Sequence, residues 1–320
     1  MDAVLNARLE EAIAGVPTRR HVQSLIVVRR GETLVERYYR DRRADDLSNT
    51  HSVTKSFLAT LVGIALRERR LTLETPIEEL LGERPVFADD ERKRMITVRH
   101  LLTMTSGLNP ASPHDIDEIA DRGESWIDGP LAAPLVAGPG DQFAYNNGAA
   151  HLLGVATARA VGRPLAEFAE EMLFGPLGID AYRWPTDPDG NSLGHGHLEV
   201  RPRDMARLGE LYLSGGRANG EQLLPTEFIS EATRPHSGGG PPEGVPYGYL
   251  WWVTEERGCR SYFAGGFAGQ YVTVLPALQL VVVTTGDVAV FTETSRNLRR
   301  LVPEVVLPTI SCRLRGFRPC

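Results

Sequence analysis

Ser52 and Lys55 stand three residues apart in a chain where lysine is rare. The chain has 35 basic residues, and only Lys55 and Lys93 among them are lysines. A lysine retained against such a preference indicates a site that needs an amine able to lose its proton, which arginine cannot do because its pKa stays above about 12. A neutral lysine amine can act as the base that activates a serine hydroxyl.

The segment that follows predicts how this pair is positioned. Residues 57–66 form a long apolar run, and residues 67–70 are charged, a pattern typical of a buried helix. We therefore expect Ser52 at the start of a helix with the Lys55 amine within reach of its hydroxyl, since i and i+3 side chains share a face. Burial would lower the pKa of the lysine. A capping serine followed by a lysine extending from a core helix would give the same pattern.

Two further segments carry polar or glycine-rich patterns. Tyr145 and Asn147 lie two residues apart, about 90 residues beyond Ser52, so an extended segment would put both polar tips on one side. A tyrosine near a lysine amine can shuttle protons, although such a segment can equally be a simple turn. Residues 263–271 hold three glycines beside strand-like sequence, which allows a strand edge to approach a ligand or forms a plain hairpin.

In this order, the three segments resemble the serine β-lactamase and penicillin-binding protein superfamily, whose signature is S-x-x-K, then Y-x-N, then a K-T-G or H-x-G strand. The closer likeness is to the branch of class C β-lactamases, family VIII esterases and 6-aminohexanoate-dimer hydrolases. Residues 100–108, 201–209, 247–252 and 281–283 also resemble this branch, so the likeness covers most of residues 20–300. It implies that Ser52 is the acylated nucleophile and Lys55 its base, that Tyr145 relays protons to the leaving group, and that Asn147 orients Lys55 and the substrate.

The third motif implies an oxyanion hole and also departs from the family. The backbone N–H groups of Ser52 and Gly266 would form the hole, with Gly265 as the next choice for the second donor. Phe263 stands where class C enzymes carry a cationic or histidine residue that helps to anchor the carboxylate of a β-lactam. We therefore expect an apolar pocket wall, weak or no β-lactamase activity, and a neutral or hydrophobic acyl substrate.

The elements that must position these residues follow an α+β layout, with strand patterns near both ends and helical patterns between them. We expect a β-lactamase/transpeptidase-like fold: an antiparallel sheet built from both termini, flanked by helices, with a mostly helical inserted subdomain. The sheet domain would comprise residues 1–69 plus 205–320 and the helical subdomain residues 70–204, with the active site at their interface. The expected strands are residues 22–28, 34–39, 247–254, 261–264, 270–275 and 280–285, and a helix is expected at 291–302.

Composition narrows the class of protein. The net charge is −6 and no long basic block is present, which argues against nucleic-acid binding. No stretch approaches the roughly 20 apolar residues of a membrane span, and residues 1–13 lack the pattern of a secretory signal. Cys259, Cys312 and Cys320 show no metal-ligand spacing. The simplest interpretation is that they are reduced thiols in a cytoplasmic protein. We expect no cofactor.

Two other patterns could indicate a different nucleophile or a metal site. Ser192 lies in a G-x-S-x-G sequence, but that nucleophile elbow needs a strand before it and a helix after it. Proline, aspartate and glycine precede it here, so we expect a loop. His195, His197 and Glu199 alternate as a zinc face would, but histidines in a glycine-rich loop are more often solvated, and we expect no metal.

These observations predict a serine hydrolase that acts on a small-molecule ester or amide through an acyl-enzyme. A transacylase would use the same site to pass the acyl group to an amine or alcohol. A non-catalytic ligand-binding relative is the alternative from another class. The motifs do not indicate the substrate or the oligomeric state.

Overall fold

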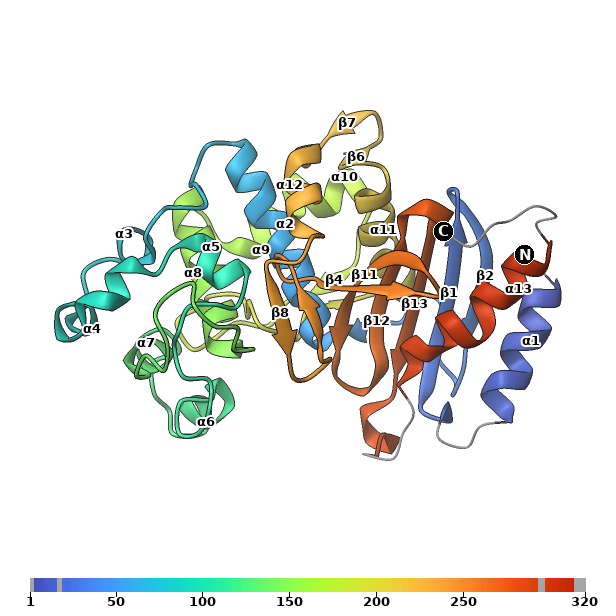
Figure 1. The fold of residues 1–320 in the computed structure, drawn as a ribbon, viewed down its shortest axis with the longest axis horizontal. Helices are drawn as coiled ribbons and strands as arrows, with labels where there is room; N and C mark the ends of the chain where they lie inside the picture. The colour runs from blue at the N-terminus through green and yellow to red at the C-terminus, as the bar shows by residue number, and fades with distance from the viewer. Residues whose placement is uncertain (1–2, 16–18, 293–296, 314–320) are drawn as a thin grey trace.

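An eight-stranded antiparallel sheet forms the centre of the computed structural model, which describes residues 3–15, 19–292 and 297–313. The strand order is β2-β1-β13-β12-β11-β10-β9-β8, so strands from the two ends of the chain pair side by side (Figure 1). The strands of this sheet are β1 (Val22–Arg29), β2 (Glu32–Tyr38), β8 (Ser237–Gly240), β9 (Val245–Tyr247), β10 (Trp252–Glu256), β11 (Cys259–Gly266), β12 (Gln270–Leu275) and β13 (Leu280–Gly286). The expected α+β fold with a sheet built from both termini is confirmed.

Helices cover both faces of the sheet, which explains why its central strands are apolar at nearly every position. In β1, Ile26 and Val28 belong to a core shared with α2 (Thr54–Arg67) and α11 (Pro202–Leu213). The alternate residues Leu25 and Val27 belong to a second core shared with α1 (Ala3–Ala14) and α13 (Leu307–Arg313).

Most of the remaining helices lie on the far side of α2 from β1 and β2 (Figure 1). These remaining helices are α3 (Ile77–Leu81), α4 (Pro85–Asp89), α5 (Val98–Leu102), α6 (Ile116–Asp121), α7 (Asp128–Ala132), α8 (Asn147–Val161), α9 (Leu165–Ala169), α10 (Gly175–Leu177) and α12 (Thr226–Ala232). The division of the chain into a sheet domain and a helical subdomain, at residues 69/70 and 204/205, stays a prediction. Two small sheets comprise β3 (Ser48–Asn49), β4 (Tyr182–Arg183) and β5 (Glu199–Val200), and β6 (Arg217–Ala218) with β7 (Glu221–Gln222).

Two expectations are wrong. The helix expected at residues 291–302 is absent from the described part of that segment, where a 3-10 turn at Leu298–Arg300 leads through a π-helical turn into α13. The proline at position 303 lacks an N–H and therefore favours the start of a helical segment over its interior. Cys259 is disulfide-bonded, so it is not a free thiol; the side chains of the other two cysteines lie outside the described residues.

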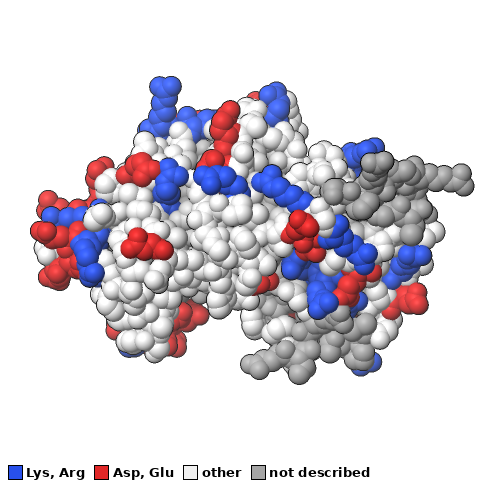
Figure 2. Space-filling view, in the orientation of Figure 1, with Lys and Arg blue, Asp and Glu red and all other residues white. Residues whose placement is uncertain are grey.

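Two further features concern the charge distribution on the surface and the hydropathy of the helices. On the face shown in Figure 2, basic and acidic side chains lie next to one another and do not form a continuous basic surface. No helix in the described ranges is long and apolar enough to cross a membrane.

Candidate active site

Ser52 lies in a short 3-10 turn, His51–Val53, that leads directly into α2. The α-helix itself begins at Thr54, two residues later than the serine. The Thr54 hydroxyl fixes this turn, since it donates to the His51 carbonyl at 2.7 Å and accepts from the Leu198 N–H at 3.1 Å. The serine is thus placed at the start of the buried helix, as the sequence predicts.

The Lys55 amine is buried and contacts three oxygen atoms. Its Nζ lies 2.9 Å from Ser52 Oγ, 2.8 Å from Asn147 Oδ1 and 2.5 Å from the His195 carbonyl oxygen. Burial lowers the pKa of Lys55 from its ordinary value to about 7, and the charge of Asp117 opposes this shift. A substantial fraction of the amine is therefore neutral near pH 7.

The three contacts of Lys55 determine where its lone pair points. An amide oxygen and a carbonyl oxygen only accept hydrogen bonds, so Asn147 and His195 receive the two N–H groups of the neutral amine. The lone pair is then left for the Ser52 hydroxyl, which both donates and accepts. This arrangement lets Lys55 take the proton of Ser52.

Tyr145 completes the group of polar side chains around Ser52. Its ring centroid lies 4.9 Å from Lys55 Nζ, and the Ser52 side chain is close enough to oppose the rise in its pKa. The ring stacks on Trp252 with centroids 5.9 Å apart. Burial raises the pKa of Tyr145 well above its ordinary value, so the phenol stays protonated and can pass a proton between neighbours.

The Tyr145–Asn147 segment is only partly as expected. It is extended up to Asn146, and Asn147 is already the first residue of α8. The Asn146 side chain caps this helix by accepting from the Ala149 N–H at 2.9 Å, and it also donates to the Leu108 carbonyl at 3.1 Å. This capping role of Asn146 was not predicted, although an asparagine before an apolar helix is a known N-cap signal.

Gly266 lies beside Ser52 at the end of β11. A Cβ atom at this position would lie 2.5 Å from the Thr50 carbonyl oxygen and 3.2 Å from the Ser52 nitrogen, so only glycine fits without a shift of the backbone. This close approach brings the end of the strand to the first turn before α2. Ser52 and Gly266 remain the predicted oxyanion donors, with Gly265 adjacent.

Phe263 does not form the pocket wall that the sequence predicts. Its ring is fully buried, stacks on Trp252 with centroids 6.4 Å apart, and lies 4.5 Å below the Arg299 guanidinium. That guanidinium is paired with Glu256. A strand residue faces a cavity only where nothing packs on it, and here aromatic and arginine side chains cover the ring.

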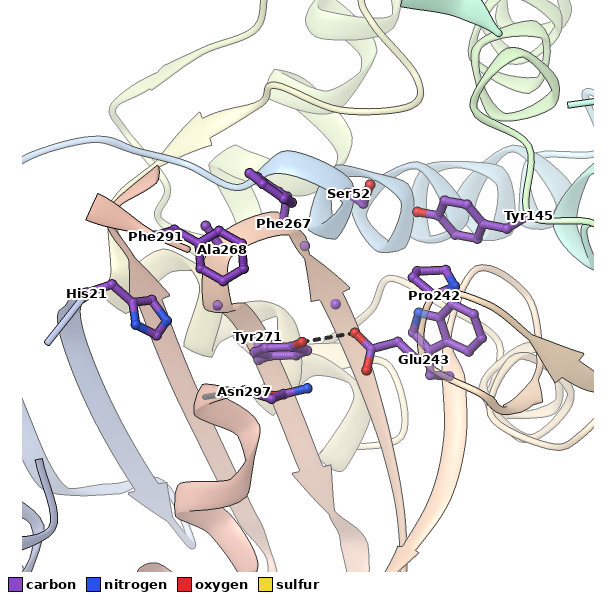
Figure 3. A pocket seen from close by; sticks show the side chains of 14 residues that line it. His21, Ser52, Tyr145, Pro242, Glu243, Phe267, Ala268, Tyr271, Phe291 and Asn297 are labelled. Carbon is purple, nitrogen blue, oxygen red and sulfur yellow. Dashed lines mark hydrogen bonds between the residues drawn. The ribbon is translucent and has the colours of Figure 1, made fainter. Parts of the chain in front are cut away.

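A cavity of about 330 Å³ opens over Ser52 and Tyr145 (Figure 3). Ten of its lining residues were not predicted as site residues, although some of them lie in segments that resemble the family. They are His21, Pro242, Glu243, Trp252, Phe267, Ala268, Gly269, Tyr271, Phe291 and Asn297. Within the described ranges, no lysine or arginine lines this cavity, and Glu243 is its acidic residue.

The loop that supplies the His195 carbonyl contains both alternative patterns. Ser192 lies in a loop, as expected, with neither a strand before it nor a helix directly after it. His197 Nδ1 accepts a hydrogen bond from Asn49 Nδ2, and Glu199 pairs with Arg183, so these two side chains have different partners. Among the described residues no group of three potential ligands could hold a metal ion.

Asp187 fixes the start of the same loop. Its carboxylate accepts from His151 Nε2 at 3.0 Å and from the Asn191 backbone N–H at 2.8 Å. Burial alone would raise its pKa, but the hydrogen bonds from His151 and Asn191 bring the pKa of Asp187 down to about 2. A buried charge satisfied in this way stabilises the loop that reaches Lys55.

The model of the Beta-lactamase family matches residues 9–302. This chain belongs to the beta-lactamase family. Its relatives include an esterase and a 6-aminohexanoate-dimer hydrolase, and the family match confirms the fold that the motifs indicated.

Three similar proteins illustrate this range. Esterase EstB of Burkholderia gladioli is 30% identical over 264 residues, which cover 75% of this chain and 65% of the esterase. The 6-aminohexanoate-dimer hydrolase of Paenarthrobacter ureafaciens is 25% identical over 303 residues, covering 87% of this chain and 74% of the hydrolase. The structure of EstCE1, described as a hydrolase with promiscuous acyltransferase activity, shares the fold with a TM-score of 0.72 at 18% identity, covering 88% of this chain and 93% of that one.

Proposed function

We propose that this protein hydrolyses an ester or amide through an acyl-enzyme on Ser52. The observation that carries the proposal is the contact set of Lys55, whose amine is buried, has a pKa of about 7 and lies 2.9 Å from Ser52 Oγ. A base poised near the working pH is what general-base activation of a serine requires.

The proposed reaction starts when Lys55 Nζ takes the proton of Ser52 and Oγ forms a bond to the carbonyl carbon of the substrate. The backbone N–H groups of Ser52 and Gly266 stabilise the oxyanion. As the oxyanion collapses, the bond to the leaving group breaks, and the Tyr145 phenol donates its proton to the leaving group while recovering one from Lys55. Water then attacks the acyl-enzyme by the reverse sequence of proton transfers and releases the acid.

The substrate is an ester or amide small enough for the cavity, and β-lactams with a free carboxylate are poor substrates. Within the described ranges the cavity has no cation to anchor such a carboxylate, and Arg299 is paired with Glu256. An unpaired carboxylate held there would cost several kcal/mol.

Acyl transfer is the second candidate, because the similar protein EstCE1 is a hydrolase with promiscuous acyltransferase activity. Its chemistry is identical up to the acyl-enzyme, after which an amine or alcohol replaces water. A cytoplasmic location also stays a prediction, and the Cys259 disulfide weighs against it because reducing compartments rarely preserve such bonds.

The test is mass spectrometry of the intact protein mixed with a panel of esters and amides, with and without amine acceptors. We expect an adduct of the acyl mass on Ser52 that decays in water. Decay only in the presence of an amine would establish the transferase. Failure of every ester, and of an activity-based serine probe, to label Ser52 would instead favour a non-catalytic binding protein.

A further inference from the structure

Glu243 places a carboxyl group inside the catalytic cavity, where the proposed hydrolysis gives it no role. It lies in the turn between β8 and β9 and lines the same cavity as Ser52 and Tyr145. Figure 3 shows its side chain below Ser52, directed toward Tyr271. A carboxyl group in this place would repel an anionic substrate.

Gly265 shows where the Glu243 carboxyl group lies relative to the site. A Cβ atom on Gly265 would lie 3.2 Å from Glu243 Oε1, so the carboxyl group packs against the end of β11. Gly265 is the residue before Gly266, one of the predicted oxyanion donors. Glu243 and Ser52 also line the same cavity, so a substrate bound there is exposed to the charge of Glu243.

Glu243 has a hydrogen-bond partner but no ion-pair partner among the described residues. The Tyr271 hydroxyl donates to Oε1 at 2.9 Å, and none of the ion pairs among the described residues includes Glu243. Arg299 is near enough to favour the charged form, but it is paired with Glu256. Burial raises the pKa of Glu243, which Tyr271 and Arg299 oppose, and a carboxylate held in such surroundings is stabilised by a cation.

Aromatic rings line the cavity that holds the carboxyl group. Tyr271 contacts Glu243 directly, and Tyr145 and Trp252 line the same cavity. Ammonium groups are attracted to aromatic faces, and most strongly to tryptophan. The cavity therefore suits a cation. It has one carboxylate and aromatic walls, and its described lining residues include no lysine or arginine.

We propose that Glu243 anchors a cation subsite, so that the preferred ester or amide carries an ammonium group in its acyl part or its leaving group. This inference rests on the proposed function and adds the chemical class of the substrate. The ammonium group contacts Glu243 and the aromatic lining beside it, which includes Tyr271, while Ser52 Oγ attacks the carbonyl. Acylation and deacylation proceed as described above, with no change in their proton transfers.

The kinetic test compares isosteric charged and neutral substrates. For the leaving group the pair is butyrylcholine and 3,3-dimethylbutyl butyrate; for the acyl part it is the 4-nitrophenyl esters of 4-(aminomethyl)benzoate and 4-ethylbenzoate. We expect the protein to prefer the cationic member of at least one pair by about tenfold or more in kcat/KM. Glu243→Gln, which keeps a hydrogen-bond acceptor for Tyr271, should bring that ratio close to one, and Glu243→Asp should restore part of it.

A binding test separates this proposal from the proposed function. In a Ser52→Ala background, calorimetry should show that benzylammonium binds more tightly than benzyl alcohol, and that Glu243→Gln removes the difference. The matched control is Glu255→Gln, because Glu255 is exposed on β10 and should leave both ratios unchanged.

The outcomes are distinguishable. If benzylammonium binds in a Glu243-dependent way but no ester is turned over, the proposed cation subsite is supported and the proposed hydrolase function is refuted. Turnover of the neutral esters with a charged-to-neutral ratio near one, or a ratio unaffected by Glu243→Gln, would overturn the cation subsite and leave the hydrolase intact.

Discussion

The Lys55 amine lies 2.5 Å from the main-chain carbonyl oxygen of His195, a residue 140 positions further along the chain. This contact takes one N–H of the amine, and Asn147 Oδ1 takes another. The remaining direction points to Ser52 Oγ. The chemistry of Lys55 thus depends on a loop that contributes a backbone group.

The first prediction concerns the nucleophile. Ser52→Ala should abolish ester turnover, because it removes the hydroxyl that hydrogen-bonds the Lys55 amine at 2.9 Å. Ser192→Ala should retain most of the activity, since Ser192 lies in a loop away from the catalytic cavity. Steady-state kinetics of both variants with one 4-nitrophenyl ester provide the measurement. An inactive Ser192→Ala protein that is folded would show that the G-x-S-x-G sequence supplies the nucleophile.

The second prediction concerns the identity of the base. Lys55→Arg should be nearly as inactive as Lys55→Ala, with kcat/KM lowered by about a hundredfold or more, because arginine keeps its proton. Circular dichroism should first establish that both variants fold, since the Lys55 side chain is buried. Full activity of the arginine variant would reduce Lys55 to a structural cation.

The third prediction concerns pH. The neutral form of Lys55 is the active base, and its pKa is about 7. The kcat/KM should therefore fall about tenfold for each pH unit well below 7 and approach a plateau above it. A profile with neutral esters from pH 5 to 9 measures this. A profile that is flat across pH 7, or that falls as the pH rises, would contradict the role of the neutral amine.

The fourth prediction concerns β-lactams. The kcat/KM for a short neutral 4-nitrophenyl ester should exceed that for a chromogenic cephalosporin by a hundredfold or more, because about 3 kcal/mol of uncompensated carboxylate desolvation gives that factor. The reason lies in Glu243 and in the lack of a cation among the described lining residues, and not in Phe263. Phe263→Lys would test whether the missing cation at position 263 causes the poor turnover of β-lactams. Efficient cephalosporin turnover by the unaltered protein would refute both this explanation and the one based on Glu243.

The fifth prediction concerns the loop behind Lys55. Asp187→Asn should lower the free energy of unfolding by about 2 kcal/mol, because buried donors of His151 and the loop lose a charged acceptor. It should also lower kcat and shift the pH profile, since the loop carries the His195 carbonyl that contacts Lys55. Thermal unfolding and the pH profile together provide the check. A destabilised variant with an unchanged pH profile would mean that the loop supports the fold without positioning the lysine.

The sequence by itself determined the local parts of this site and the general fold. The i, i+3 spacing places Lys55 against Ser52 in any helical turn, because helical geometry makes such residues neighbours. Apolar runs with turn residues such as Gly31 marked the strands, since the central strands are covered on both faces. These features depend on neighbours in the chain, so a sequence pattern can indicate them.

Only the tertiary structure decided what surrounds that pair. The His195 carbonyl is a backbone group, identical in every residue, and no side-chain pattern marks it. Glu243 reaches the cavity because a turn between two strands folds beside β11, and Phe263 is covered because Trp252 and Arg299 pack on it. Such contacts join segments far apart in the chain, and their chemistry exists only once the sheet and its loops have packed together.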